Sequence, residues 1–286
     1  MTGIINWDEL WKATHSGGFH HHGKDLAAHW DARAQEFNKR VMKNKERSNS
    51  QVAMLDLTSG ETVLDVGAGT GRLALPMARL AKSVTALDQS VGMLSCLQEN
   101  LASEGIKNVR CIQKSWQDVA DGELEQHDVV ISSNSLGVYD LKAALAKMDS
   151  LAKRAVYIFT FADGKRDDGF RQFLKAGKDG LEREHIRHGR DEIGPAGYLI
   201  IYNLLADMNI LADIKVMQWH SKEQYKNLDE AVDGWKKMHE LPAEKEADLK
   251  ECLSQRLVKE GDGLCLNRHH KQVLISWQKA RPPFSA

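Results

Sequence analysis

The stretch ETVLDVGAGTGRLALPMA, residues 61–78, constrains the fold more than any other part of the chain. A run of β-branched and apolar residues predicts a buried strand that ends at Asp65, and LALPMA has the spacing of a helix. Between them Gly67, Gly69 and Gly71 alternate with small residues. Glycines permit positive φ and let a ligand lie against bare backbone, while a helix N-terminus presents free amide groups. Three alternating glycines lose more chain entropy than a plain turn requires, so the stretch predicts a ligand-binding loop between a strand and a helix.

Strands and helices alternate on both sides of this loop. From residue 62 to 160, short apolar runs and segments of helical period follow the order β-α-β-α-β-β-α-β. Alternation of this kind predicts a parallel sheet with helices on both faces. Two later apolar runs, 210–220 and 271–280, predict two more strands. The expected fold is therefore α/β, with a seven-stranded, mostly parallel, Rossmann-like sheet.

The remaining segments carry a helical pattern of their own and are too long for ordinary connections. We expect an N-terminal helical arm, a cofactor-binding core, a helical cap insertion, and a last part that holds two core strands and a second helical insertion. The boundaries in that order are 1–57, 58–164, 165–209 and 210–286, with the second insertion at 222–260.

Charge and hydropathy exclude several classes of partner. Lys and Arg total 39 against 40 for Asp and Glu, so no strong field gathers nucleic acid or an anionic membrane. No run of about 18 apolar residues and no leader pattern is found, which predicts a cytoplasmic protein without a membrane span. The basic run KRVMKNKER, residues 39–47, is either a solvated helix face with Val41 and Met42 turned inward or a contact to phosphates.

The spacing of the glycines distinguishes two cofactor classes. The dinucleotide fingerprint G-x-G-x-x-G needs a third glycine where this chain has Arg72. The pattern D-x-G-x-G-x-G instead resembles motif I of the class I S-adenosylmethionine-dependent methyltransferases. In that family the glycine loop passes under the amino-acid part of the cofactor, and an acid that ends the second strand binds both ribose hydroxyls. Asp88, in VTALDQS, stands at that place.

The resemblance extends to three further stretches. LDQSVGML is similar to the family's D-x-S-x-x-M-L, in which the residue after the acid, here Gln89, and Met93 approach the adenosine. CIQKSWQDV has Ser115 and Trp116 where the family usually writes an acidic residue and alanine, so Trp116 is either an aromatic wall for the adenine or a buried packing residue. HDVVISSNSLGVYD resembles motif IV without the N-P-P-Y or D-P-P-Y signature of enzymes that methylate nucleic-acid amines. Its Asn134 and Ser135 would lie beside the methyl group or cap a turn.

The N-terminal stretch SGGFHHHGKDLAAHWDARA, residues 16–34, has two parts. His20, His21 and His22 diverge in a glycine-flanked turn and have no paired ligand cluster, so we expect no metal site there, and their role stays open. The second part is similar to a W-D-x-R-A stretch with which the family closes an N-terminal helix over the cofactor. Trp30 and Arg33 would then face the cleft, with Arg33 on a carboxylate, or belong to a packing helix.

The resemblance implies a methyltransferase that binds S-adenosylmethionine, releases S-adenosylhomocysteine and acts on a small molecule by in-line transfer. The alternatives are an RNA or protein methyltransferase and a non-catalytic binding protein of the same fold. The protein is either a monomer or a homodimer. The implied cofactor contacts are Asp65, Gly67, Ala68, Gly69, Gly71, Asp88, Gln89, Met93, Ser115, Trp116, Asn134, Ser135, Trp30 and Arg33. The sequence names no general base, and the candidates for lining the acceptor pocket are Tyr139, Asp140, Asp163, His185, His188 and Tyr198.

Overall fold

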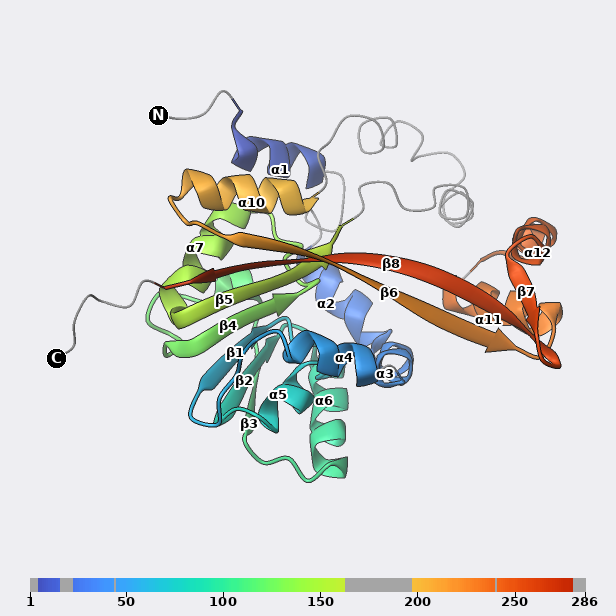
Figure 1. Ribbon diagram of the computed structural model, residues 1–286, viewed down its shortest axis with the longest axis horizontal. Helices are drawn as coiled ribbons and strands as arrows, with labels where there is room; N and C mark the ends of the chain where they lie inside the picture. Colours follow the sequence, from blue (N-terminus) through green and yellow to red (C-terminus); the bar gives the residue numbers. More distant parts are fainter. Residues whose placement is uncertain (1–4, 16–22, 44, 163–196, 240, 280–286) are drawn as a thin grey trace. The chain divides into compact units, whose positions relative to one another are not determined.

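A computed structural model describes residues 5–15, 23–43, 45–162, 197–239 and 241–279 (Figure 1). The chain divides into two compact units, which are described separately. The first comprises residues 1–160, 197–215 and 273–286, and the second comprises 161–196 and 216–272. His20, His21, His22, Asp163, His185 and His188 lie outside the described residues.

Strands and helices of the first unit alternate as the sequence predicts. Its elements, in chain order, are α1 (Trp7–His15), α2 (Gly23–Asp31), α3 (Ala34–Met42), α4 (Lys45–Val52), β1 (Thr62–Val66), α5 (Ala74–Ala78), β2 (Ser83–Asp88), α6 (Val91–Ser103), β3 (Val109–Gln113), the one-turn helix η2 (Trp116–Asp118), β4 (His127–Ser133), α7 (Leu141–Leu151), β5 (Ala152–Phe161) and α10 (Gly197–Asp207). The strands β6 (Asp213–Tyr225) and β8 (Gly263–Gln278) begin or end in this unit.

The sheet has the strand order β3-β2-β1-β4-β5-β8-β6. The pairs β1–β2, β1–β4, β2–β3 and β4–β5 are parallel. Because β1 pairs with β2 on one side and β4 on the other, the connections leave β1 in opposite directions, and ligands of such sheets bind at the carboxyl ends of the strands that flank this switch point. Gly67 follows β1 and Asn134 follows β4 at that edge.

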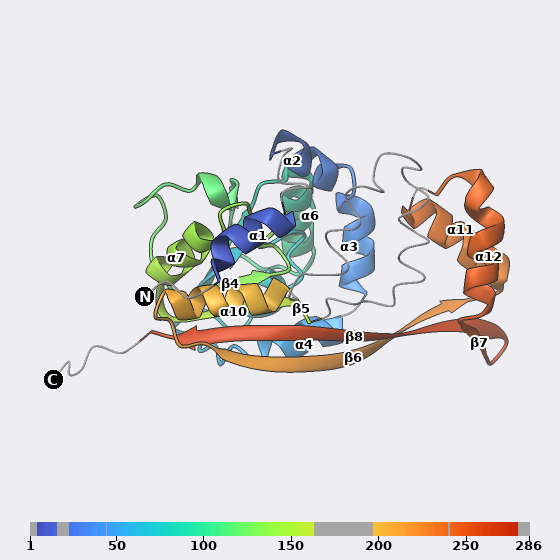
Figure 2. The ribbon, with the colours of Figure 1, turned by 90° about the horizontal axis from the view of Figure 1, so that it is seen from above.

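Apolar side chains bury both central strands. Val63, Leu64 and Val66 of β1 are buried, as are the middle residues of β4. Helices α5 and α6 pack on β2 and β3, and α7 packs on β4. Helix α1 lies beside α10 in both views (Figures 1 and 2). The core therefore holds β1 and β4 rigidly, and with them the loops that follow them.

The second unit has its own small core. Helices α11 (Leu228–His239) and α12 (Glu246–Ser254), the one-turn helix η3 (Ala243–Lys245) and strand β7 (Leu257–Glu260) belong to it. Trp235 is almost wholly buried among apolar residues of both helices, and its indole Nε1 donates to Tyr225 Oη at 2.9 Å. Helices α11 and α12 lie within 222–260, where the sequence pattern indicates a helical insertion, while β6 and β7 occupy the two ends of that range.

Three features differ from the sequence prediction. The short β7, which pairs antiparallel with β8, makes the sheet eight-stranded. The strands predicted at 210–220 and 271–280 occupy 213–225 and 263–278, because both continue through polar residues that the apolar pattern could not show. Helix α10, which the sequence pattern assigns to the first cap, belongs to the first unit because its apolar face, with Ile200, Leu204 and Leu205 buried, packs against α1 and α7.

Candidate functional site

The glycine loop after β1 adopts the backbone that its sequence predicts. Gly67, Gly69 and Gly71 have φ of 74°, 56° and 86°, the left-handed region that residues with a Cβ rarely enter. The amides of Gly67 and Ala68 both donate to Leu87 O, at 2.8 and 3.0 Å. These bonds tie the loop to the end of β2, where Asp88 stands.

The three glycines have different surroundings. A Cβ on Gly67 would lie 2.2 Å from Ser135 Cβ, and one on Gly71 would lie 2.2 Å from Leu97 Cδ1. A Cβ on Gly69 would meet only Phe37 Cε1, at 3.9 Å. Gly67 and Gly71 therefore serve close packing, whereas Gly69 borders open space.

That space is a cavity in the first unit. Its walls come from β1, the glycine loop, the end of β4 and the N-terminal arm, and it is lined by Phe37, Asp65, Gly67, Ala68, Gly69, Arg72, Leu73 and Ser133. Four of the predicted cofactor contacts thus lie together around it. Phe37 and Arg72 line it too, although the sequence reasoning did not include them among those contacts.

Asp65 is a buried carboxylate beside this cavity. The residue is 2% exposed, and its Oδ2 has no hydrogen-bond partner among the residues that the structure describes. Burial raises the pKa of Asp65 to about 7, the nearby Arg72 guanidinium opposes the rise, and Asp88 adds to it. An unpartnered buried carboxylate is costly unless a cation meets it, so this wall is suited to a positively charged ligand group.

Arg72 provides the opposite charge. Its Nη2 donates to Ser133 Oγ at 2.9 Å, and its Nη1 donates to Gln51 Oε1 of α4. Burial lowers the pKa of Arg72, and the Asp65 carboxylate opposes that shift. These two hydrogen bonds fix the guanidinium next to Asp65. The cavity wall therefore carries one acidic and one basic group, which suit the ammonium and the carboxylate of a zwitterionic ligand.

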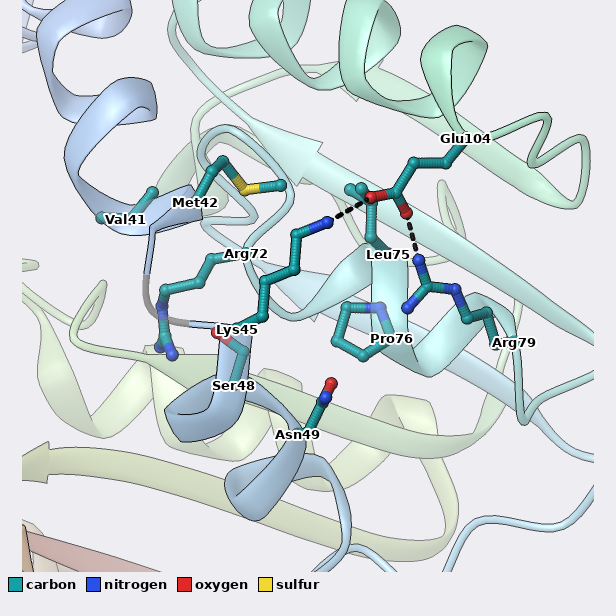
Figure 3. Close-up of a pocket in the computed structure, with 10 residues that line it drawn as sticks. All are labelled: Val41, Met42, Lys45, Ser48, Asn49, Arg72, Leu75, Pro76, Arg79 and Glu104. Atoms are coloured by element: carbon teal, nitrogen blue, oxygen red, sulfur yellow. Dashed lines mark hydrogen bonds and ion pairs between the residues drawn. The ribbon is translucent and has the colours of Figure 1, made fainter.

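A second hollow lies beside Arg72, between α3, α4 and α5 (Figure 3). Glu104 accepts from Lys45 Nζ at 3.1 Å and pairs with Arg79, as the dashed lines in Figure 3 show. Val41 and Met42 line it with Leu75 and Pro76. Because Glu104 is already paired with Lys45 and Arg79, we interpret this hollow as part of the packing between the helices.

Asp88 links the glycine loop to helix α6. Its Oδ2 accepts from Gly69 N at 2.8 Å, and its Oδ1 accepts from Ser90 N at 2.9 Å. Burial raises the pKa of Asp88, while these two backbone hydrogen bonds lower it. Gln89 next to it is half-buried. Met93 of α6, which is 3% exposed, packs together with Cys96 against Ala34 of the arm.

Of the other two predicted contacts at the end of β4, Ser135 is turned toward the protein and Asn134 is exposed. Ser135 Oγ donates to Val66 O at 2.6 Å and lies 2.7 Å from Ser132 Oγ. Asn134 is exposed, with a φ of 56°, and its amide donates to Phe159 O. This geometry is that of a turn after β4 which fixes the floor beneath Gly67.

Ser115 and Trp116 begin the one-turn helix after β3. Trp116 is 6% exposed, and its indole Nε1 has no hydrogen-bond partner. Lys147 Nζ lies 5.2 Å from the ring centroid and donates to Trp116 O. The ring is therefore buried, as expected for a packing residue. Because its Nε1 has no partner among the described residues, the interpretation of Trp116 as a wall for the adenine also stays open.

The arm residues Trp30 and Arg33 do not line the cavity. Arg33 Nη1 lies 2.8 Å from His29 Nδ1, and the Trp30 ring packs edge-on against Phe37, with centroids 5.6 Å apart. Phe37, which is seven residues after Trp30 but belongs to α3 and not to α2, is the aromatic group that reaches the cavity. The only sequence signal for it is an apolar aromatic residue within an otherwise polar stretch of the arm.

The remaining acceptor candidates are spread over the surface. Tyr139 is 46% exposed and lies under Lys12, and Asp140 caps α7 by accepting from Ala143 N. Tyr198 is half-buried in α10.

Among the residues that the structure describes, no group of three His, Cys, Asp or Glu side chains could hold a metal ion. In the same part of the chain, no helix is long and apolar enough to cross a membrane.

Known proteins are similar to this chain in sequence and in fold. The family model described as a methyltransferase domain matches residues 63–155. An uncharacterised protein of Haemophilus influenzae is 31% identical over 209 residues, which are 71% of this chain and 73% of that protein. Demethylmenaquinone methyltransferase of Thermobifida fusca is 30% identical over 135 residues, or 46% of this chain and 57% of the relative.

Among solved structures, the YcgJ protein of Bacillus subtilis has a TM-score of 0.55 and 16% identity, with 83% of this chain and all of that one covered. This likeness concerns the fold, and the sequence matches add the family. The chain belongs to the class I S-adenosylmethionine-dependent methyltransferases.

Proposed function

We propose that this enzyme transfers the methyl group of S-adenosylmethionine to a small-molecule acceptor, and that the amino-acid end of the cofactor lies in the cavity beneath the glycine loop. The observation that carries the site is the pair of opposite charges on one wall. The unpartnered Oδ2 of Asp65 suits an ammonium group, and the fixed guanidinium of Arg72 suits a carboxylate. A free amino acid, and the amino-acid end of this cofactor, carry both.

The chain's own residues have three tasks in such a reaction. Bound S-adenosylmethionine supplies a methyl group on a positively charged sulfur, already activated for displacement. Asp65 and Arg72 would fix one end of the cofactor and Asp88 its ribose. The protein must then hold the acceptor on line with the methyl carbon and exclude water.

Two observations favour a small acceptor over RNA. The net charge is −1, which provides no general attraction for a polyanion. In the basic run, Lys39 pairs with Glu36, Lys45 pairs with Glu104, and Arg40 lies over the Phe37 ring. The names of the relatives do not separate the two classes, since they include methyltransferases of both small molecules and ribosomal RNA.

The cofactor site can be tested by titration calorimetry with two ligands. S-adenosylhomocysteine carries the amino-acid end, and methylthioadenosine lacks it. Arg72→Ala should weaken S-adenosylhomocysteine about tenfold to a hundredfold, the value of hydrogen bonds to a charged group, and leave methylthioadenosine unchanged. Arg33→Ala is the matched control, and a selective loss in that variant instead would move the carboxylate to the arm, as the sequence resemblance implies. Equal losses of both ligands in Arg72→Ala would contradict the proposed orientation.

The acceptor class can be tested by turnover. We expect release of S-adenosylhomocysteine when the enzyme is incubated with a metabolite extract from which macromolecules have been filtered, and none with purified RNA. Turnover with RNA alone, weakened by neutralising Lys39, Arg40, Lys43 and Lys45 and by added salt, would establish the RNA alternative. Cofactor binding without turnover in any fraction would indicate a binding protein.

A further inference from the structure

Asp31, the last residue of α2, reaches the first turn of α6. Its Oδ1 accepts from Ser90 Oγ at 2.5 Å and from Gly92 N at 2.8 Å. Ser90 is the N-cap of α6, and its Oγ also accepts from Met93 N at 3.0 Å. Two of the four free amides of this helix end are therefore satisfied by side chains, one of which comes from the N-terminal arm.

The same serine holds Asp88. Ser90 N donates to Asp88 Oδ1 at 2.9 Å, while its hydroxyl is bound to Asp31. Ser90 is completely buried. A series of two hydrogen bonds, joined through the covalent frame of Ser90, thus links the carboxylate of Asp31 to that of Asp88, so that Asp31 restrains the residue whose amide orients the Asp88 carboxylate.

The arm and α6 lie so close together that a side chain at Gly92 would require its neighbours to shift by a few tenths of an ångström. A Cβ there would lie 3.0 Å from Asp31 Cα and 3.1 Å from Asp31 O, and 3.3 Å from Ala34 Cβ. Ala34 is 2% exposed. This contact is closely packed, and Asp31 is held by main chain as well as by its hydrogen bonds.

A second polar link joins the arm to the glycine loop at another point. Asn38 of α3 exchanges hydrogen bonds with Asn100, at 2.9 and 3.3 Å, and Asn100 Nδ2 also donates to Thr70 O. This link does not include Ser90 or Asp88. It therefore provides a control that disturbs the same arm without touching the series from Asp31.

We propose that Asp31 is a positioning residue for cofactor binding, which acts through Ser90 to hold the Asp88 carboxylate against the ribose hydroxyls. The inference rests on the proposed function, in which Asp88 takes the ribose. Asp31 does not touch the cofactor in this role. Its loss leaves the hydrogen bond from Gly69 N to Asp88 in place but loosens Ser90, whose amide orients the other carboxylate oxygen, so that the contact to the diol weakens selectively.

The test compares S-adenosylhomocysteine with its analogue that lacks the ribose 2′-hydroxyl, by titration calorimetry on the full chain. The wild type should prefer the hydroxylated ligand by about tenfold or more, as for a hydrogen bond to a charged group. Asp31→Ala should reduce that preference by about threefold to tenfold. Asp31→Asn should keep it, because the amide oxygen can accept the same two hydrogen bonds.

Two further variants keep the result interpretable. Ser90→Ala removes the hydroxyl that donates to Asp31 and keeps the amide that donates to Asp88, so it should lower the preference as Asp31→Ala does, which guards against a folding defect in either one. Asn38→Ala should change the affinities for the two ligands by the same factor. Each variant is first checked by circular dichroism and thermal melting.

The outcomes separate the inference from the function on which it rests. If Asp31→Ala weakens both ligands equally, or if Asp31→Asn fails to restore the preference, Asp31 has only a structural role and the inference is overturned. If the wild type shows no preference, or keeps one in Asp88→Ala, the ribose assignment of Asp88 is what fails. A wild type that does not bind S-adenosylhomocysteine at all would contradict the proposed function itself.

Discussion

Replacing Gly67 by alanine is expected to abolish methyl transfer and to weaken cofactor binding by about a hundredfold or more, roughly 3 kcal/mol in binding. The new Cβ would lie 2.2 Å from Ser135 Cβ and 2.6 Å from Ser135 Oγ. Ser135 cannot simply withdraw, because its hydroxyl is bonded to Val66 O and lies 2.7 Å from Ser132 Oγ. A φ of 74° at a residue with a Cβ adds a cost of about 1–2 kcal/mol.

Both costs act on the loop that borders the cavity. The Gly67 amide donates to Leu87 O, so a displaced loop also loses its attachment to β2 and shifts the Gly69 amide that donates to Asp88. We expect the folded core to survive with a lower melting temperature, since the sheet itself is untouched. Release of S-adenosylhomocysteine and calorimetric affinity measure the effect.

Gly60→Ala is the matched control for this prediction. A Cβ on Gly60 would have no neighbouring atom within 4 Å, and the residue is exposed, so activity and melting temperature should not change. The double variant Gly67→Ala, Ser135→Gly should recover part of the affinity, because it removes the clash and leaves the backbone cost. Full activity of Gly67→Ala would contradict the prediction, because it would mean that the loop can accommodate a Cβ beside Ser135.

The sequence predicts the parts of this site that depend on local pattern. A strand, an alternating-glycine loop and a helix can be recognised because each has its own periodicity or backbone requirement. Asp88 follows from its place after the second strand. The alternation of strands and helices likewise predicts the arrangement that the sheet order β3-β2-β1-β4-β5 exhibits.

Contacts between distant side chains could not be predicted in this way. Asp31 and Ser90 are 59 residues apart in the chain, and nothing local to either sequence indicates their hydrogen bond. Arg72 stands out in the sequence only as the residue that breaks the dinucleotide fingerprint, because its bonds to Gln51 and Ser133 depend on how α4 and β4 are brought together. Periodicity indicates which face of an element is buried, but not which partner meets it.

The contribution of Asp65 to the free energy of unfolding of the ligand-free enzyme is expected to fall as the pH rises from about 4 to about 7. The pKa of Asp65 is raised from 3.8 to about 7 by burial. Between these values the folded state binds a proton that the unfolded state has lost, so raising the pH favours unfolding. At about 1.4 kcal/mol per pKa unit, the contribution of Asp65 lost by pH 8 is at most roughly 4 kcal/mol.

Asp65→Asn should remove this pH dependence, because the amide stays neutral. The variant should therefore be more stable than the wild type at pH 8, keep about a third of that advantage at pH 5 and lose it at about pH 4, as measured by urea unfolding at each pH. Its affinity for S-adenosylhomocysteine should nevertheless be lower at pH 8, by about tenfold or more, since the ammonium group loses its charged partner. In the wild type that affinity should rise with pH through about 7 as the carboxyl group ionises.

Asp128→Asn provides a control of opposite sign on the neighbouring strand β4. Although burial acts to raise it, the pKa of Asp128 lies below its usual value because Thr62 N and Thr62 Oγ donate to the carboxylate. A depressed pKa contributes stability above the unfolded value of about 4 that is lost only as the pH falls further. Asp128→Asn should thus destabilise the protein by the same amount at pH 5 and pH 8. If Asp65→Asn behaves in this way too, Asp65 is ionised throughout that range, and a bound or nearby cation already compensates its charge.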